Sequence, residues 1–245
     1  MEALYYLASP PVYGPMPVEE ALHRLDEILD RSGGDRMAES SVLYSVGRLE
    51  AMRGRFDEAR VASARGVKIL EDLGHRPQAE SARGEDFGYI ETLAGDLPAA
   101  EQELRRACDT LRALGETGIF STLVAELALV LCELGRFDEA APFIEESRTA
   151  AAAEDILSQA RWRIASARVQ ADQGRPNEAI DVARQAVAML EPTDVIDIQA
   201  DTLVQFARVL MAAGKTAEPA RALERALALY RRKGNVVSAE RARRC

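Results

Sequence analysis

The residues of this 245-residue chain that could carry out acid–base or metal chemistry are few and far apart. The two histidines, His23 and His75, lie well separated and form no metal-ligand spacing with a cysteine. A zinc site needs three or four such ligands, and a catalytic triad needs a histidine beside its nucleophile. We therefore expect exposed histidines near helix ends, and we expect no catalytic residue, no metal and no cofactor.

The cysteines and one glycine-containing segment lead to the same expectation. Cys108, Cys132 and Cys245 lack paired spacing, which indicates a reducing compartment, and we expect the first two to be small core residues. The segment 214–216 (Gly-Lys-Thr) resembles the end of a phosphate-binding loop. That loop needs a glycine where Val209 stands, and a strand leading into it. We therefore expect a helix terminator here, and a chain that is not an enzyme.

Arginine and tyrosine supply the positive signal, because they recur with a period. One column of residues, spaced by 39 to 41 positions, is Arg48, Tyr89, Leu129, Arg168 and Arg208. Arg161 lies about two helical turns before Arg168, and Tyr44 lies one turn before Arg48. Guanidinium groups bind carboxylates and phosphates strongly. The alternative is that these arginines pair with acids on neighbouring helices, such as Glu50, Glu91 and Asp172.

The elements that position this column are marked by a ladder of glycines. Gly54, Gly95, Gly135, Gly174 and Gly214 stand 41, 40, 39 and 40 residues apart. An apolar segment with helical periodicity precedes each glycine, and another follows it. Glycine just beyond a helix end adopts the left-handed conformation without a steric penalty. The ladder therefore predicts five tight turns between antiparallel helices.

Small residues accompany the glycines at fixed offsets. Five positions after the glycine stand Ala59, Ala100, Ala140 and Ala179, with Pro219 as the exception. Helices joined by a short turn approach closely only where side chains are small. Half a period later come Gly34, Gly74, Gly115 and Gly234, or Asp155 and Asp194 as helix N-caps. Each unit thus holds two helices of roughly 15 to 18 residues.

These motifs resemble the tetratricopeptide repeat, most clearly at Gly135-Arg136-Phe137-Asp138-Glu139-Ala140. The resemblance implies an all-α, right-handed superhelical solenoid of antiparallel helix pairs. The period of about 40 exceeds the usual repeat of about 34 residues, and the closing proline is mostly absent. In such stacks the first helix of each unit lines a concave groove. The expected partner-binding residues of that groove are Tyr44, Arg48, Tyr89, Arg161, Arg168 and Arg208.

A narrower resemblance covers nearly the whole chain. Segments 49–59, 115–123 and 230–237 resemble the C-terminal helical region of large actinobacterial regulators of the cyclase/ATPase (AAA) or LuxR type. Those proteins join a cyclase or DNA-binding domain to a signalling ATPase and then to helical repeats. Neither cyclase nor ATPase activity is carried over, because the chain contains neither domain.

The predicted organisation is a single solenoid over residues 1–245. It comprises a truncated first unit (1–34), units 38–74, 78–115, 118–154, 156–192 and 195–234, and a basic helical stub (235–245). The first unit begins in mid-repeat and exposes an apolar end formed by Leu4, Tyr5, Tyr6 and Leu7. Either upstream sequence is missing or this end mediates self-association.

Charge is distributed unevenly along the chain. Residues 220–245 carry eight Lys/Arg and two Asp/Glu, a balance of +6; since the whole chain is −9, residues 1–219 total −15. An acidic body does not suit direct nucleic-acid binding. We expect the basic tail to consist of solvated helix ends, or to contact an acidic partner or the acidic body. No apolar run predicts a membrane span or a signal peptide, which favours the cytoplasm.

The sequence favours a non-catalytic scaffold for protein–protein interaction or regulation. Its partner would be a protein or peptide, with an acidic one favoured by the arginine column. The first alternative is a sensor that binds a small acidic or phosphorylated ligand in the concave groove. The second is a homo-oligomerisation module.

Overall fold

The computed structural model describes residues 9–245, and every regular element within that range is a helix. These helices are α2 (Ser9–Tyr13), α3 (Val18–Arg31), α4 (Arg36–Met52), α5 (Phe56–Asp72), α6 (Arg76–Ala94), α7 (Leu97–Leu114), α8 (Phe120–Glu133), α9 (Phe137–Ala150), α10 (Ile156–Asp172), α11 (Pro176–Leu190), α12 (Ile196–Ala212), α13 (Ala217–Lys233) and α14 (Val236–Ala242). The apolar end predicted at residues 4–7, and the self-association assigned to it, lie outside the described residues.

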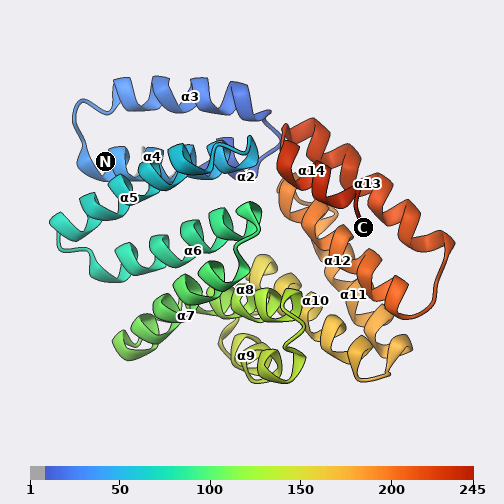
Figure 1. The fold of residues 1–245 in the computed structure, drawn as a ribbon. Helices are drawn as coiled ribbons and strands as arrows, with labels where there is room; N and C mark the ends of the chain where they lie inside the picture. Colours follow the sequence, from blue (N-terminus) through green and yellow to red (C-terminus); the bar gives the residue numbers. More distant parts are fainter. Residues whose placement is uncertain (1–8) are drawn as a thin grey trace.

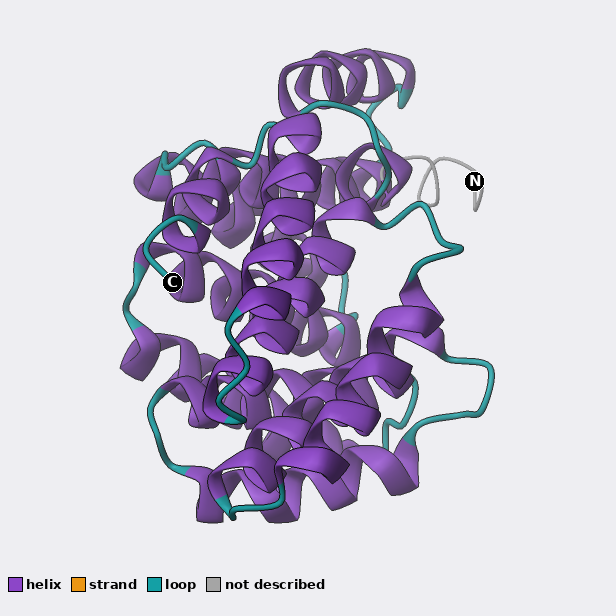
Figure 2. Ribbon diagram, turned by 90° about the vertical axis from the view of Figure 1, so that its right-hand side faces the viewer, coloured by secondary structure: helices purple, strands orange, loops and turns teal. Residues whose placement is uncertain are grey.

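Most of the helices form pairs that stack side by side. The pairs are α4 with α5, α6 with α7, α8 with α9, α10 with α11, and α12 with α13. The first helix of each pair also contacts the first helix of the next pair. These first helices therefore form an inner layer, and Figure 1 shows the pairs following one another around a curved stack. Figure 2, turned by 90°, shows helices joined by loops. The predicted all-α solenoid of helix pairs is confirmed.

The turn inside each pair is closed by the glycine that the ladder predicts. The φ angles of Gly54, Gly95, Gly135, Gly174 and Gly214 lie between 72° and 88°, a region that favours glycine. The next residue then donates its N–H to a carbonyl five positions back, as Arg55 does to Glu50 at 3.0 Å. A left-handed glycine followed by this hydrogen bond is the Schellman arrangement of a helix C-terminus.

The two aspartates predicted as N-caps at the half-period behave differently. Asp155 caps α10, since its carboxylate accepts the N–H of Ser158 at 3.1 Å. The prediction for Asp194 is wrong, because α12 begins after Val195 and has no side-chain cap. A two-residue backbone turn, from the N–H of Ile196 to the carbonyl of Asp194, occupies the place of the cap.

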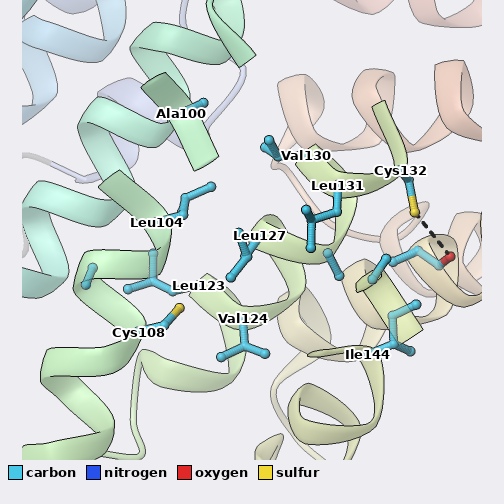
Figure 3. Close-up of a cluster of buried hydrophobic side chains, with 14 of the residues drawn as sticks. Ala100, Leu104, Cys108, Leu123, Val124, Leu127, Val130, Leu131, Cys132 and Ile144 are labelled. Carbon is cyan, nitrogen blue, oxygen red and sulfur yellow. Dashed lines mark hydrogen bonds between the residues drawn. The ribbon is translucent and has the colours of Figure 1, made fainter. Parts of the chain in front are cut away.

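Close helix approach depends on small side chains, as the offsets indicate. Ala59, Ala100, Ala140 and Ala179 are all fully buried. The largest core cluster lies between α7, α8, α9 and α10, where leucines of α8 meet those of α7 (Figure 3). Cys108 and Cys132 are buried in this cluster, so the prediction that they are core residues is confirmed. Burial raises the pKa of both thiols to about 12.

The two ends of the described chain meet and close the curve. Figure 1 shows α14 beside the start of α3, and α14 contacts α4. Lys233, at the end of α13, is fully buried and donates to three carbonyls, those of Pro11, Gly14 and Met16 at 2.8, 2.9 and 3.0 Å. The guanidinium of Arg241 donates to the carbonyl of Thr92. The expectation of solvated helix ends is therefore wrong for Lys233 and Arg241.

Candidate functional site

The inner helices enclose a cavity of about 190 Å³, which we call the central cavity. Helices α4, α6, α8, α10 and α12 contribute to its wall, while α2 and the segment from α14 to Cys245 close it. Its polar lining consists of Tyr13, Arg48, Tyr89, Thr92, Glu126, Glu133, Arg161, Asp197, Asp201, Thr202, Gln205, Arg208, Tyr230, Ser238 and Arg241. The remainder is mainly leucine, isoleucine and valine, with Met52, Gly88, Ala242 and Cys245. The site thus gathers residues separated by more than two hundred positions in the sequence.

Arg48 is held on one side of the cavity by aromatic rings. Its guanidinium carbon lies 4.2 Å from the centroid of the Tyr89 ring and 5.2 Å from that of Tyr13. It donates to the carbonyl of Glu85 at 3.2 Å and lies 3.5 Å from the carboxylate of Asp86. Cation–π contacts strengthen when the cation is desolvated, and Arg48 is only 5% exposed. This arginine is therefore fixed by the fold rather than free in a groove.

The other three arginines expected in the groove pair with acids of α8. Arg161 lies 3.0 Å from Glu126. Arg168 and Arg208 both bind Glu133, and Gln205 also donates to that carboxylate. Burial opposes ionisation of Glu133, but Arg208 and Arg168 outweigh it and hold the pKa of this carboxyl below its ordinary value. The arginine charges in this region are therefore largely neutralised within the protein.

Two carboxylates of α12 stand one helical turn apart on the cavity wall. Asp197 accepts hydrogen bonds from the hydroxyl of Tyr89 at 3.1 Å and from the amide of Asn235 at 2.9 Å. Asp201 accepts a short hydrogen bond from the hydroxyl of Tyr230. Within residues 9–245 neither aspartate has an ion-pair partner. Burial, reinforced by the nearby Asp197, raises the pKa of Asp201 to about 7, and burial also raises the pKa of Asp197.

A second cavity, of about 340 Å³, lies between α4 and α6. It shares Val12, Tyr13 and Arg48 with the central cavity, so Arg48 forms part of the partition between the two. Tyr44 lines this second cavity together with Glu85 and other residues. Tyr44 also packs close to Gly66, where an added Cβ would lie 2.7 Å from its ring.

The structure brings four of the six residues expected in one groove to the central cavity and places the other two elsewhere. Arg48, Tyr89, Arg161 and Arg208 line the central cavity, and Tyr44 lines the second cavity with Arg48. Arg168 lines neither cavity, but it donates to Glu133, which lines the central cavity. The acids that neutralise the arginines are Asp86, Glu126 and Glu133. The sequence named other acids, of which Glu50 pairs with Arg53 and Arg55, and Glu91 with Arg60.

Sequence reasoning missed Asp197, Asp201 and Tyr230. A signal for the two aspartates was present in the sequence, since Asp197 and Asp201 share one face of α12 with Arg208. Tyr230 carries no such signal, because it comes from the outer helix α13 and reaches the cavity across its own helix pair, where its hydroxyl binds Asp201 of α12.

The two histidines and segment 214–216 lie outside the central cavity. His23 is exposed within α3, and His75 is exposed just before α6, so only the second lies at a helix end. Residues 214–216 form the turn between α12 and α13, with a helix leading in, as predicted. Over residues 9–245 there is no group of three or more His, Cys, Asp or Glu side chains that could hold a metal ion. No helix in that range is long and apolar enough to cross a membrane.

Comparisons with known proteins agree with this architecture. Residues 118–191 match the tetratricopeptide-repeat family. No curated protein matches the chain by sequence. A crystal structure of NprR in complex with its cognate peptide NprX superposes with a TM-score of 0.65 at 12% identity, covering 92% of this chain and 66% of that one.

Two further structures are similar. The apo form of the quorum sensor NprR from B. thuringiensis has a TM-score of 0.55 at 13% identity and covers 86% of this chain. This chain spans 60% of that NprR chain. BtubC (BKLC) from P. vanneervenii has a TM-score of 0.60 at 14% identity, covering 86% of this chain and 89% of that one. At such identities the likeness concerns the fold. The chain therefore has a tetratricopeptide-like fold of helical repeats, and the repeat itself is recognised in residues 118–191.

Proposed function

We propose that this chain is a non-catalytic regulatory scaffold that binds a peptide or a peptide-like ligand in the central cavity. The observation that carries the proposal is the composition of the cavity wall, which combines apolar side chains with polar groups from the inner helices. Ligand sites in proteins are commonly mainly apolar, with a few well-placed polar groups. The fold it shares with NprR, a protein crystallised with its cognate peptide, supports the same reading.

The cavity wall also suggests how binding would be communicated. A ligand held there would touch α6, α8, α10 and α12 together with the closing helix α14. Binding would thereby stabilise the closed form of the solenoid over an open one. We propose on this basis that the chain is the repeat region of a larger bacterial signalling or transcription regulator. The three free cysteines suit a reducing, cytoplasmic location.

The cavity volume favours one alternative, a sensor for a small ligand. At about 190 Å³ the central cavity is smaller than the roughly 300–1,000 Å³ typical of drug-sized ligands. A small metabolite would fill much of it, whereas a peptide would insert one end or one side chain.

Filling the cavity tests the proposal. Leu129 lines the central cavity, so Leu129→Trp should weaken binding of members of a random tripeptide library by about tenfold or more, measured by calorimetry. Leu114→Trp is the matched control, since Leu114 is exposed on the outer helix α7. Equal affinity of both variants, with wild-type helical content, would contradict the proposal. Charge reversal of Arg168 and Arg208 is less informative, because it would set three carboxylates together at Glu133.

A further inference from the structure

The charges that line the central cavity are not equally satisfied. Every arginine on its wall already has an acceptor: Arg48 has Asp86, Arg161 has Glu126, Arg208 has Glu133, and Arg241 has the carbonyl of Thr92. At Arg48, Arg161 and Arg208 an anionic ligand would therefore compete with carboxylates that the protein itself supplies, and at Arg241 with a backbone carbonyl. A cationic ligand would instead meet lining aspartates that have no ion-pair partner among residues 9–245.

Asp201 is a lining carboxylate with one partner among residues 9–245, and that partner is not a cation. One of its oxygens accepts from the hydroxyl of Tyr230, and the other accepts no hydrogen bond from any residue in 9–245. Arg161 of α10 and Arg241 of α14 face it, but neither is within ion-pair distance, since each is bound elsewhere. Asp197, on its own helix, adds a second negative charge, which Tyr89 and Asn235 solvate but do not neutralise.

A buried carboxylate without a counter-ion is costly, because desolvation penalises the charged form. The usual remedies are a paired cation or protonation of the group. Here Asp201 borders an open cavity, so a ligand can supply the cation. The side chain of Tyr230 lines the same cavity, and aromatic rings attract cations.

We propose that the ligand of the central cavity presents a protonated amine to Asp201. The inference rests on the proposed function, and it replaces the acidic ligand that the arginine column predicts. The amine would donate to the free oxygen of Asp201, with Asp197 adding long-range attraction. A peptide N-terminus, a lysine side chain and a small organic amine carry the same group, and the experiment below distinguishes them.

Matched ligands test the amine. The probes are tripeptides that bind the wild-type protein. Each is compared with its N-acetylated form, which lacks the N-terminal amine, and with a form in which norleucine replaces lysine, which lacks the side-chain amine. Alkylamines form a third arm and represent small organic amines. We expect removal of one specific amine to weaken binding at least about tenfold. Asp201→Asn should abolish this preference, whereas Asp181→Asn, an exposed aspartate on outer helix α11, should keep it. The proposal is overturned if acetylated and norleucine forms bind as tightly as their parents.

Proton linkage gives a test that needs no variant. The pKa of Asp201 lies near 7 without ligand, and a bound ammonium lowers it, so binding at pH 7 should release protons. Calorimetry in two buffers of different ionisation enthalpy measures this release. Affinity should also fall as the pH drops below 7, because a proton competes with the amine. Proton uptake on binding, or an unchanged affinity at pH 5.5, would overturn the inference.

The outcomes separate this inference from the function on which it rests. In one outcome, Leu129→Trp disrupts binding but removal of the amine does not change the affinity. This outcome would overturn the inference and leave the central cavity as the binding site. Binding that Leu129→Trp leaves unchanged would overturn the proposed function, and the inference with it. Absence of binding by all peptide probes, together with amine-dependent binding of the alkylamines, would support Asp201 and favour the small-ligand sensor.

Discussion

Single atoms decide how closely the helices of this solenoid approach. Gly84 in α6 lies against Ala107 in α7, and a Cβ added at residue 84 would sit 2.4 Å from the Cβ of Ala107. Neither atom can rotate away, so the helices must separate. We expect Gly84→Ala to cost about 1–3 kcal/mol in the free energy of unfolding, although alanine is the better helix former. Urea denaturation measures the change.

A second substitution shows whether this contact is the cause. Gly84→Ala combined with Ala107→Gly moves the methyl group from one helix to the other, and should recover most of the lost stability apart from the helix-propensity cost of the new glycine. If the single variant is as stable as the wild type, the helices have room to spare and the close approach is not required.

Residue types that repeat with the period were predictable from the sequence, and contacts that occur in one helix pair alone were not. The glycines at turns and the alanines between helices each repeat with the unit, because every unit solves the same packing problem. Asp201 and Tyr230 meet through the last pair alone, and no other pair repeats that contact. The arginine column was found for the same periodic reason. The acids that neutralise the arginines, Glu126 and Glu133 of α8, could not be identified in the same way. They depend on which helices lie side by side, and the sequence alone does not show that.

At the scale of elements, one lysine joins the C-terminus of α13 to the segment around α2. The ammonium of Lys233 has three hydrogens, and all three are donated to backbone carbonyls of residues 11, 14 and 16. Lys233→Met keeps most of the apolar volume but leaves those carbonyls without a donor. An unsatisfied buried polar group costs about 1–3 kcal/mol, and three carbonyls lose their donor here. We therefore expect the free energy of unfolding to fall by about 3 kcal/mol or more.

The lost contact should also be visible locally. Hydrogen exchange of amides in residues 11–17 should accelerate in Lys233→Met, while exchange within α8 and α10 changes little. Lys215→Met is the control, because Lys215 is exposed in the turn before α13. Equal protection of residues 11–17 in both variants would show that α2 is held by its apolar contacts alone.

Over the whole molecule, closure converts a curved stack into an enclosure. An open tetratricopeptide-like stack offers a groove to solvent, whereas here Ser238, Arg241, Ala242 and Cys245 cover the central cavity from the C-terminal side. The hydrogen bond from Arg241 to the carbonyl of Thr92 fastens this cover to the end of α6. A ligand that enters the cavity from this side must displace the cover, at least in passing.

Removal of residues 236–245 therefore tests whether α14 controls access. The shortened chain keeps Lys233 and all five helix pairs, so its remaining helices should stay folded. We expect a tripeptide that binds the full chain to associate and dissociate about tenfold faster, because no helix has to move, and stopped-flow fluorescence measures both rates. Val236→Ala, at an exposed position of the intact α14, should leave the rates unchanged. Identical rates in the shortened and full chains would mean that the ligand enters elsewhere, past the partition at Arg48 that separates the two cavities.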